Sequence, residues 1–102
     1  MKIAIASEEK NPKGTVSDRA GRATFYLIFD EQKALLETVK NPFSIGGGGA
    51  GFSVAKMLAD KQVHTVIAEK FGPKMSVALE ERGVSFIPFS GSITDALNAA
   101  LQ

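Results

Sequence analysis

Residues 63–83 read VHTVIAEKFGPKMSVALEERG, and this stretch decides the class of the fold. Residues 63–68 form a short run rich in β-branched side chains, which is typical of a strand. Pro73 then stands at the first position of a helical pattern over residues 73–82, and Gly83 supplies the left-handed residue that ends it. The stretch therefore predicts a strand, a turn and a helix, which is the repeating unit of an α/β fold.

The residues after this unit continue the alternation of strand and helix. Residues 84–89 predict a last strand, and Pro88 places it at a sheet edge or near its own end because proline donates no hydrogen bond. Residues 92–101 predict a closing helix, since Ser92 and Asp95 have the spacing of a capping box. One apolar stripe runs along this helix: Ile93, Ala96, Leu97, Ala100 and Leu101.

The residues before this unit predict one more helix and three strands. Residues 52–61 carry apolar side chains at helical spacing, and residues 3–6 are an apolar run that could be covered on both faces. Residues 24–30 and 33–39 predict a hairpin, although its turn lacks the usual Gly or Asn. The whole order predicts one α/β domain over residues 1–102, with a five-stranded mixed sheet and helices on both faces.

The composition excludes several classes of function. The 102 residues include 12 Lys+Arg and 11 Asp+Glu, so a net charge of +1 gives no basic field that predicts nucleic-acid binding. The chain has no cysteine and one histidine, which excludes thiolate-bound metal sites, cysteine nucleophiles and an ordinary multi-histidine zinc site. There is neither a membrane span nor a signal-peptide core, so we expect a cytoplasmic protein with no membrane partner.

No arrangement of residues predicts catalysis. No spacing typical of a Ser-His-Asp triad, of paired acid–base carboxylates or of metal ligands rises above chance in the sequence. His64 lies inside the predicted strand 63–68, where a histidine is usually a packing residue. We therefore expect no enzyme, no catalytic residue and no metal ligand.

A run of glycines precedes the first predicted helix: Gly46, Gly47, Gly48, Gly49 and, after Ala50, Gly51. Three of them satisfy G-x-G-x-x-G, and Glu69 lies where an acidic contact to a ribose could sit. The run nevertheless follows a hairpin rather than the first parallel strand, and Phe52 replaces the lysine of a Walker A motif. Three interpretations stay open: a flexible structural loop, a lid over an anion or cofactor at a helix N-terminus, and a dinucleotide fingerprint.

The segment of residues 17–23 is a second candidate site. Arg19 and Arg22 stand three apart beside Gly21, and two guanidinium groups could clamp a carboxylate or a phosphate. A solvated surface turn, or a helical turn that starts at Ser17 and Asp18, explains the same residues.

Residues 69–74 connect a predicted parallel strand to a helix, a position where open α/β sheets bind ligands. Lys70 and Lys74 would add positive charge there. An ordinary connection whose Gly72 and Pro73 start the helix is an equally good explanation.

Several of these segments together resemble a known family. They are residues 1–6, residues 16–23 running into 25–29, the Asn41-Pro42 pair that ends the hairpin, and residues 72–75 with the helix after them. Their order and spacing over nearly the whole chain resemble the dinitrogenase iron–molybdenum cofactor biosynthesis family. The resemblance implies a ribonuclease H-like α/β fold and a non-enzymatic binding or carrier protein. Its ligand would be an anionic iron–sulfur or iron–molybdenum-type cofactor or precursor, with cofactor-assembly proteins as partners.

The chain departs from the family at positions suited to metal binding. Many relatives carry a histidine-phenylalanine pair where Arg19 and Ala20 stand, and His or Cys in the loop that here holds glycines and Ala50. The groups suited to an anion remain, so a cluster would be held by charge and backbone N–H groups. The alternatives are a nucleotide- or phosphate-binding module that uses the glycine run, and a protein-interaction domain that has lost cofactor binding.

The predicted site lies at the C-terminal ends of the first and fourth strands. Its predicted cofactor-binding residues are Arg19, Gly21, Arg22, Gly46, Gly47, Gly48, Gly49, Gly51 and Gly72.

Overall fold

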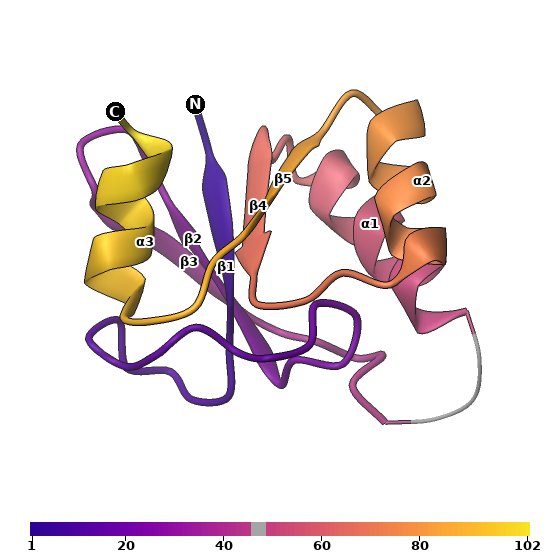
Figure 1. Ribbon diagram of the computed structural model, residues 1–102, viewed down its shortest axis with the longest axis horizontal. Helices are drawn as coiled ribbons and strands as arrows, with labels where there is room; N and C mark the ends of the chain where they lie inside the picture. The colour runs from indigo at the N-terminus through magenta and orange to yellow at the C-terminus, as the bar shows by residue number, and fades with distance from the viewer. Residues whose placement is uncertain (46–48) are drawn as a thin grey trace.

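A computed structural model describes residues 1–45 and 49–102 and contains five strands and three helices within them (Figure 1). Their order confirms the predicted α/β class. The elements are β1 (Ile3–Ser7), β2 (Phe25–Phe29), β3 (Leu35–Lys40), α1 (Ala50–Asp60), β4 (Thr65–Ala68), α2 (Pro73–Glu81), β5 (Ser85–Pro88) and α3 (Ile93–Ala100).

The five strands form one mixed sheet in the order β3-β2-β1-β4-β5. The β2–β3 hairpin is antiparallel and β2 also pairs with β1 in antiparallel fashion, whereas β1–β4 and β4–β5 are parallel. The predicted mixed sheet is confirmed. Pro88 ends β5, and β5 is an outer strand, as the missing N–H of proline requires.

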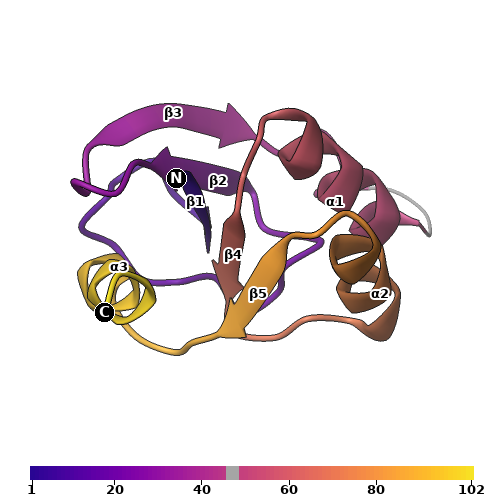
Figure 2. The ribbon, with the colours of Figure 1, turned by 90° about the horizontal axis from the view of Figure 1, so that it is seen from above.

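The helices lie on both faces of the sheet, as predicted (Figure 2). Because side chains alternate along a strand, Ala4 and Ala6 of β1 face α1 and α2, whereas Ile3 and Ile5 face α3. The two core clusters therefore share the central strand. This architecture is compatible with a ribonuclease H-like arrangement.

Two predicted helix ends are confirmed by their local geometry. Ser92 caps α3, since its side chain accepts a hydrogen bond of 3.0 Å from the Asp95 N–H. Gly83 follows α2 with a φ of 70°, the left-handed conformation in which glycine is favoured. Among the described residues, no helix has the length and apolar character needed to cross a membrane.

One expectation about local structure is wrong, and one alternative is excluded. Helix α1 begins at Ala50 rather than at residue 52, so Gly51 belongs to its first turn and not to a loop. Ser17 and Asp18 start no helical turn, because the Ser17 N–H donates to the Ala6 carbonyl at 2.8 Å and the Ser17 carbonyl accepts from the Glu69 N–H at 2.9 Å. These bonds hold residues 17–24 across the end of the sheet, and we call this segment the arginine loop.

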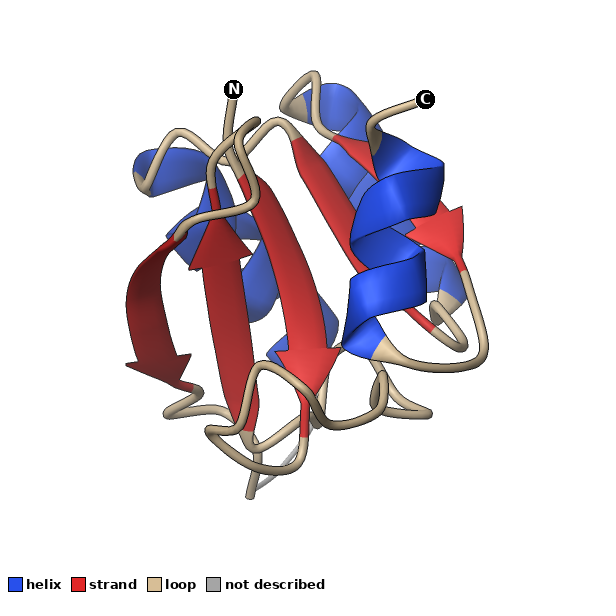
Figure 3. Ribbon diagram, turned by 90° about the vertical axis from the view of Figure 1, so that its left-hand side faces the viewer, coloured by secondary structure: helices blue, strands red, loops and turns tan. Residues whose placement is uncertain are grey.

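The connecting loops are not spread evenly around the sheet. Figure 3 shows several of them crossing at the end to which the β1 arrow points, and Figure 1 shows both termini at the other end. The loop-rich end is therefore the end at which the predicted site lies.

Candidate functional site

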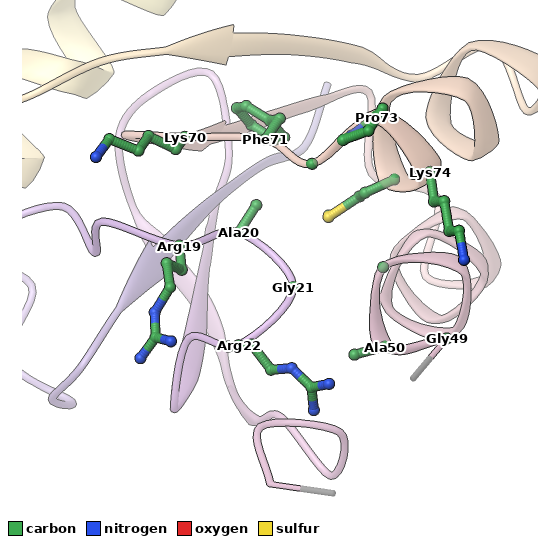
Figure 4. A pocket seen from close by; sticks show the side chains of 13 residues that line it. Arg19, Ala20, Gly21, Arg22, Gly49, Ala50, Lys70, Phe71, Pro73 and Lys74 are labelled. Carbon is green, nitrogen blue, oxygen red and sulfur yellow. The ribbon is translucent and has the colours of Figure 1, made fainter. Parts of the chain in front are cut away.

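A pocket of about 550 Å³ opens at the carboxyl ends of β1 and β4 (Figure 4). These strands are neighbours, and the chain leaves β1 toward β2 but leaves β4 toward β5 on the opposite side. Such a switch point is where open α/β sheets bind ligands. Three segments line the pocket: residues 19–22 of the arginine loop, residues 49–51 at the start of α1, and residues 70–75 between β4 and α2.

The charged side chains of the pocket are all cationic. They are Arg19, Arg22, Lys70 and Lys74, and none of the described lining residues is acidic. Figure 4 shows Arg22 and Lys74 pointing toward the start of α1 from two sides, and we call them the inner cations. Arg19 and Lys70, the outer cations, point away. The Arg19 side chain is 71% exposed and lies 3.8 Å from the Asp18 carboxylate.

Two helices begin at the pocket. Gly49 is the N-cap of α1 and Gly72 is the N-cap of α2. Among the described residues, no side chain caps either helix, and the first turn of each helix contains no acidic residue. The first N–H groups of a helix have no partner within it, and the helix dipole makes this end partly positive. Both helix ends therefore add to the positive character that the four side chains create.

The glycines of the pocket have different roles. A Cβ on Gly51 would lie 2.8 Å from the Met75 Cβ, and a Cβ on Gly21 would lie 3.4 Å from the Gly51 backbone, so these two glycines let three segments pack closely. Gly49 has a φ of 85°, which other residues rarely adopt. A Cβ on Gly72 would meet nothing within 4 Å, so packing does not require a glycine at this lining position.

Tyr26 supports the arginine loop from the core. Its hydroxyl donates a hydrogen bond to the Ala20 carbonyl, and the Ala20 N–H donates to the Lys70 carbonyl at 3.1 Å. Burial, reinforced by the negative charge of Glu8, raises the pKa of Tyr26 well above its ordinary value of 10.0. The phenol therefore remains a protonated donor, and it fixes the loop against the segment after β4.

Glu8 closes the arginine loop near its two ends. Its carboxylate accepts hydrogen bonds from the Ser17 hydroxyl at 2.6 Å and from the Thr24 hydroxyl at 2.8 Å. Partial burial acts to raise the pKa of Glu8, but the bonds from Ser17 and Thr24 and the charge of Arg19 together lower it. The carboxylate is thus ionised at neutral pH and remains an acceptor for both hydroxyls.

Six of the nine predicted site residues line this pocket: Arg19, Gly21, Arg22, Gly49, Gly51 and Gly72. Gly46, Gly47 and Gly48 lie outside the described residues, and the role of all nine in cofactor binding stays a prediction. The arginines are not equivalent. The Arg22 Nη1 donates to the Phe43 carbonyl at 3.2 Å, whereas Arg19 extends toward solvent.

Sequence reasoning left some functional candidates open or missed them. Lys70 and Lys74 were recognisable as cations near a helix start, but only the structure separates the inner Lys74 from the outer Lys70 (Figure 4). The Met75 side chain lines the pocket and carried no signal beyond its helical spacing.

His64 and the acidic residues form no centre at the pocket. The His64 Nδ1 accepts a hydrogen bond of 3.1 Å from the Lys2 N–H at the amino end of β1, which is the far end of the sheet. Across residues 1–45 and 49–102, no three His, Cys, Asp or Glu side chains gather closely enough to hold a metal ion.

The fold and the pocket define a small α/β domain with a cationic pocket at the switch point of its sheet. The chain belongs to the dinitrogenase iron–molybdenum cofactor family, whose sequence model matches residues 1–102. The resemblance seen in the sequence is thereby confirmed. None of the curated proteins matches the chain.

Several solved structures are similar to this chain. The apo form of the orange protein from Desulfovibrio gigas is 27% identical with a TM-score of 0.90, over 98% of this chain and 86% of that one. A putative NifB protein from Thermotoga is 30% identical with a TM-score of 0.79, over 98% and 89%. A putative dinitrogenase from Methanocaldococcus jannaschii, 14% identical with a TM-score of 0.68 over 99% and 88%, shows the shared fold alone.

Proposed function

We propose that this chain binds or carries an anionic iron–sulfur or iron–molybdenum-type cofactor, or its precursor, and catalyses no reaction. The family and the similarity to the orange protein and to a putative NifB protein support a cofactor-binding or carrier role. The observation that carries the proposal is the pocket itself, which combines four cations, no described acidic side chain and two uncapped helix starts.

The groups at the pocket fit an anion held without direct bonds to metal. The chain has no cysteine, and His64 lies at the far end of the sheet. The Met75 side chain lines the pocket but is only 2% exposed. Sulfide or oxo groups on the surface of a cluster accept hydrogen bonds from guanidinium, ammonium and backbone N–H groups, and such charge-assisted bonds are strong. The volume of about 550 Å³ suits a ligand of this size class.

Each part of the pocket has a distinct role in this proposal. Arg22 and Lys74 hold the anion from two sides, and the first turn of α1 faces it with N–H groups. Phe71, Pro73 and Met75 form an apolar wall beside these charges. Because apolar surroundings lower the local dielectric constant, they strengthen the attraction between the cations and the bound group.

Anaerobic loading with a synthetic anionic iron–sulfur cluster tests the proposal. We expect visible absorbance to stay with the protein through gel filtration, and to fall in Arg22→Gln and in Lys74→Gln. Lys33→Gln in the β2–β3 turn removes the same charge away from the pocket and should load like the wild type. A wild-type chain that stays colourless after anaerobic loading would contradict the proposed function.

The two alternative functions would give different results when thermal stability is measured with each ligand. A nucleotide- or phosphate-binding module would be stabilised against heat by ATP or inorganic phosphate and not by the cluster. A protein-interaction domain would be stabilised neither by ATP or phosphate nor by the cluster. Its partner would be sought among cofactor-assembly proteins, which are also the partners expected of a carrier.

A further inference from the structure

We propose that Asn41 is a positioning residue of the pocket, which fixes where the Arg22 guanidinium lies without touching the bound group. The identity of that group rests on the proposed function, but the geometry does not. Asn41 follows β3 directly and is not among the residues that line the pocket.

Asn41 is buried and uses its whole side chain for hydrogen bonds. It is 1% exposed, and its Nδ2 donates to the Gly21 carbonyl at 3.2 Å and to the Ala23 carbonyl at 2.9 Å. Its Oδ1 accepts from the Phe43 N–H at 2.9 Å. The two carbonyls belong to the residues on either side of Arg22. Asn41 thus holds the backbone from which the Arg22 side chain departs.

The same asparagine also holds the group to which Arg22 extends. The Phe43 carbonyl accepts the 3.2 Å hydrogen bond from the Arg22 Nη1, and the N–H of this same Phe43 is bound by Asn41. Side chain and backbone therefore form a closed ring through Asn41, Phe43 and Arg22. Figure 4 shows the Arg22 guanidinium directed toward Ala50 at the start of α1, where the proposed anion would lie.

Asparagine is the residue type that this ring requires. One short amide supplies two donors and an acceptor at once, whereas aspartate supplies only acceptors and serine a single donor. Since the site is buried, removing the amide would leave two carbonyls and an N–H to find other partners. The Arg22 guanidinium would then sample several positions. Because an anion would have to order this side chain on binding, its affinity would fall.

A double-mutant cycle tests whether Asn41 acts through Arg22. We expect Asn41→Ala to weaken binding of the iron–sulfur cluster about tenfold in the wild-type background and to change it little in the Arg22→Gln background. Leu97→Ala is the matched control, because Leu97 is also buried but belongs to α3, on the other face of the sheet. It should lower the melting temperature without weakening binding. An equal loss of affinity from Asn41→Ala in both backgrounds would overturn the inference.

A second measurement needs no ligand. In nuclear magnetic resonance spectra at low temperature, the Nη–H signals of Arg22 in the wild type should be distinct and slow to exchange with water, because Nη1 donates to the Phe43 carbonyl, unlike those of the exposed Arg19. In folded Asn41→Ala, the Arg22 signal should approach that of Arg19. If alanine prevents folding, Asn41→Ser serves instead, since its uncharged hydroxyl can still accept from the Phe43 N–H but has one hydrogen to donate and cannot bind both carbonyls.

The two proposals fail in different ways. If the wild type binds no cluster, the proposed function fails and the Arg22 signal alone decides the positioning role. An unchanged Arg22 signal in a folded Asn41 variant overturns that role, whatever the chain binds.

Discussion

Gly51 and Met75 bring the first turns of α1 and α2 into contact, because a Cβ on Gly51 would lie 2.8 Å from the Met75 Cβ and 3.2 Å from the Met75 N. Both helices therefore start beside the same pocket. The contact explains why a residue with poor helix propensity stands in the first turn of α1: the space between the helices admits no side chain at that position.

Gly51→Ala should lower the free energy of unfolding by about 1–3 kcal/mol, because the added methyl group overpacks the contact between the helices. Urea unfolding measures the change. Gly72→Ala is the control, since a Cβ there meets nothing within 4 Å, and its loss should stay below about 1 kcal/mol. Equal stability of Gly51→Ala and the wild type would show that the helices can separate at no cost.

The inner and outer cations should contribute unequally to anion binding. Arg22→Gln and Lys74→Gln should each weaken cluster affinity about tenfold, because each removes a charge-assisted hydrogen bond. Arg19→Gln and Lys70→Gln should change affinity less than about threefold, since exposed charges that point away are screened by solvent and salt. Titrations of the four variants at one fixed ionic strength measure this order, and the reverse order would contradict the geometry of Figure 4.

The Glu8 carboxylate should make the arginine loop sensitive to acid. Its pKa is lowered in the folded chain from an ordinary 4.5, so its stabilising effect is complete above pH 4.5 and is lost as the pH falls through the lower, folded value. Glu8→Gln should therefore destabilise the chain at pH 7, by less than about 1 kcal/mol for so exposed a group, and the difference should shrink in strong acid. Urea unfolding of the wild type and of Glu8→Gln from pH 7 down to strong acid measures whether the difference in their free energies of unfolding shrinks as the pH falls.

Tyr26 should resist ionisation until the chain unfolds. Its pKa is raised in the folded state, so alkaline pH above the ordinary value of 10.0 favours the unfolded chain, in which the phenol ionises. Because Tyr26 is the only tyrosine, tyrosinate absorbance should rise together with the loss of circular dichroism. Tyr26→Phe should cost about 1 kcal/mol at pH 7 by removing the donor to the Ala20 carbonyl. Tyrosinate absorbance in a chain that is still folded would contradict this account.

Ser92→Ala should destabilise α3 by about 1 kcal/mol, because the Asp95 N–H loses its acceptor. Ser92→Asp, which restores an acceptor at the N-cap, should recover most of the loss in thermal unfolding. Two variants of equal stability would show that the hydroxyl does not cap the helix.

The features that could be predicted from sequence depend on neighbouring residues only. Pro88 at an outer strand, Gly83 after α2 and the Ser92 cap follow from the properties of single residues and their immediate surroundings. The mixed sheet followed from the order of the apolar runs, whereas the pairing of β1 with β4, which brings the two strand ends of the site together, became visible only in the structure.

The features that could not be predicted depend on residues far apart in the chain. The close approach of Gly51 to Met75 joins two helices, and the path of the arginine loop depends on Ala6 and Glu69. Sequence spacing makes Arg19 and Arg22 equivalent, but only Arg22 has the Phe43 carbonyl within reach. Likewise, the Asn41-Pro42 pair marks the end of a hairpin, and nothing local shows that the amide reaches back to Gly21 and Ala23.

The groups that fasten the arginine loop are separate from those that line the pocket. Glu8, Tyr26 and Asn41 lie outside the lining, so the lining side chains can be exchanged while the frame stays in place. The domain is therefore a ready scaffold for redesign. Ala50→Cys, at a position that lines the pocket, would add a soft metal ligand beside the inner cations without altering the groups that hold the loop.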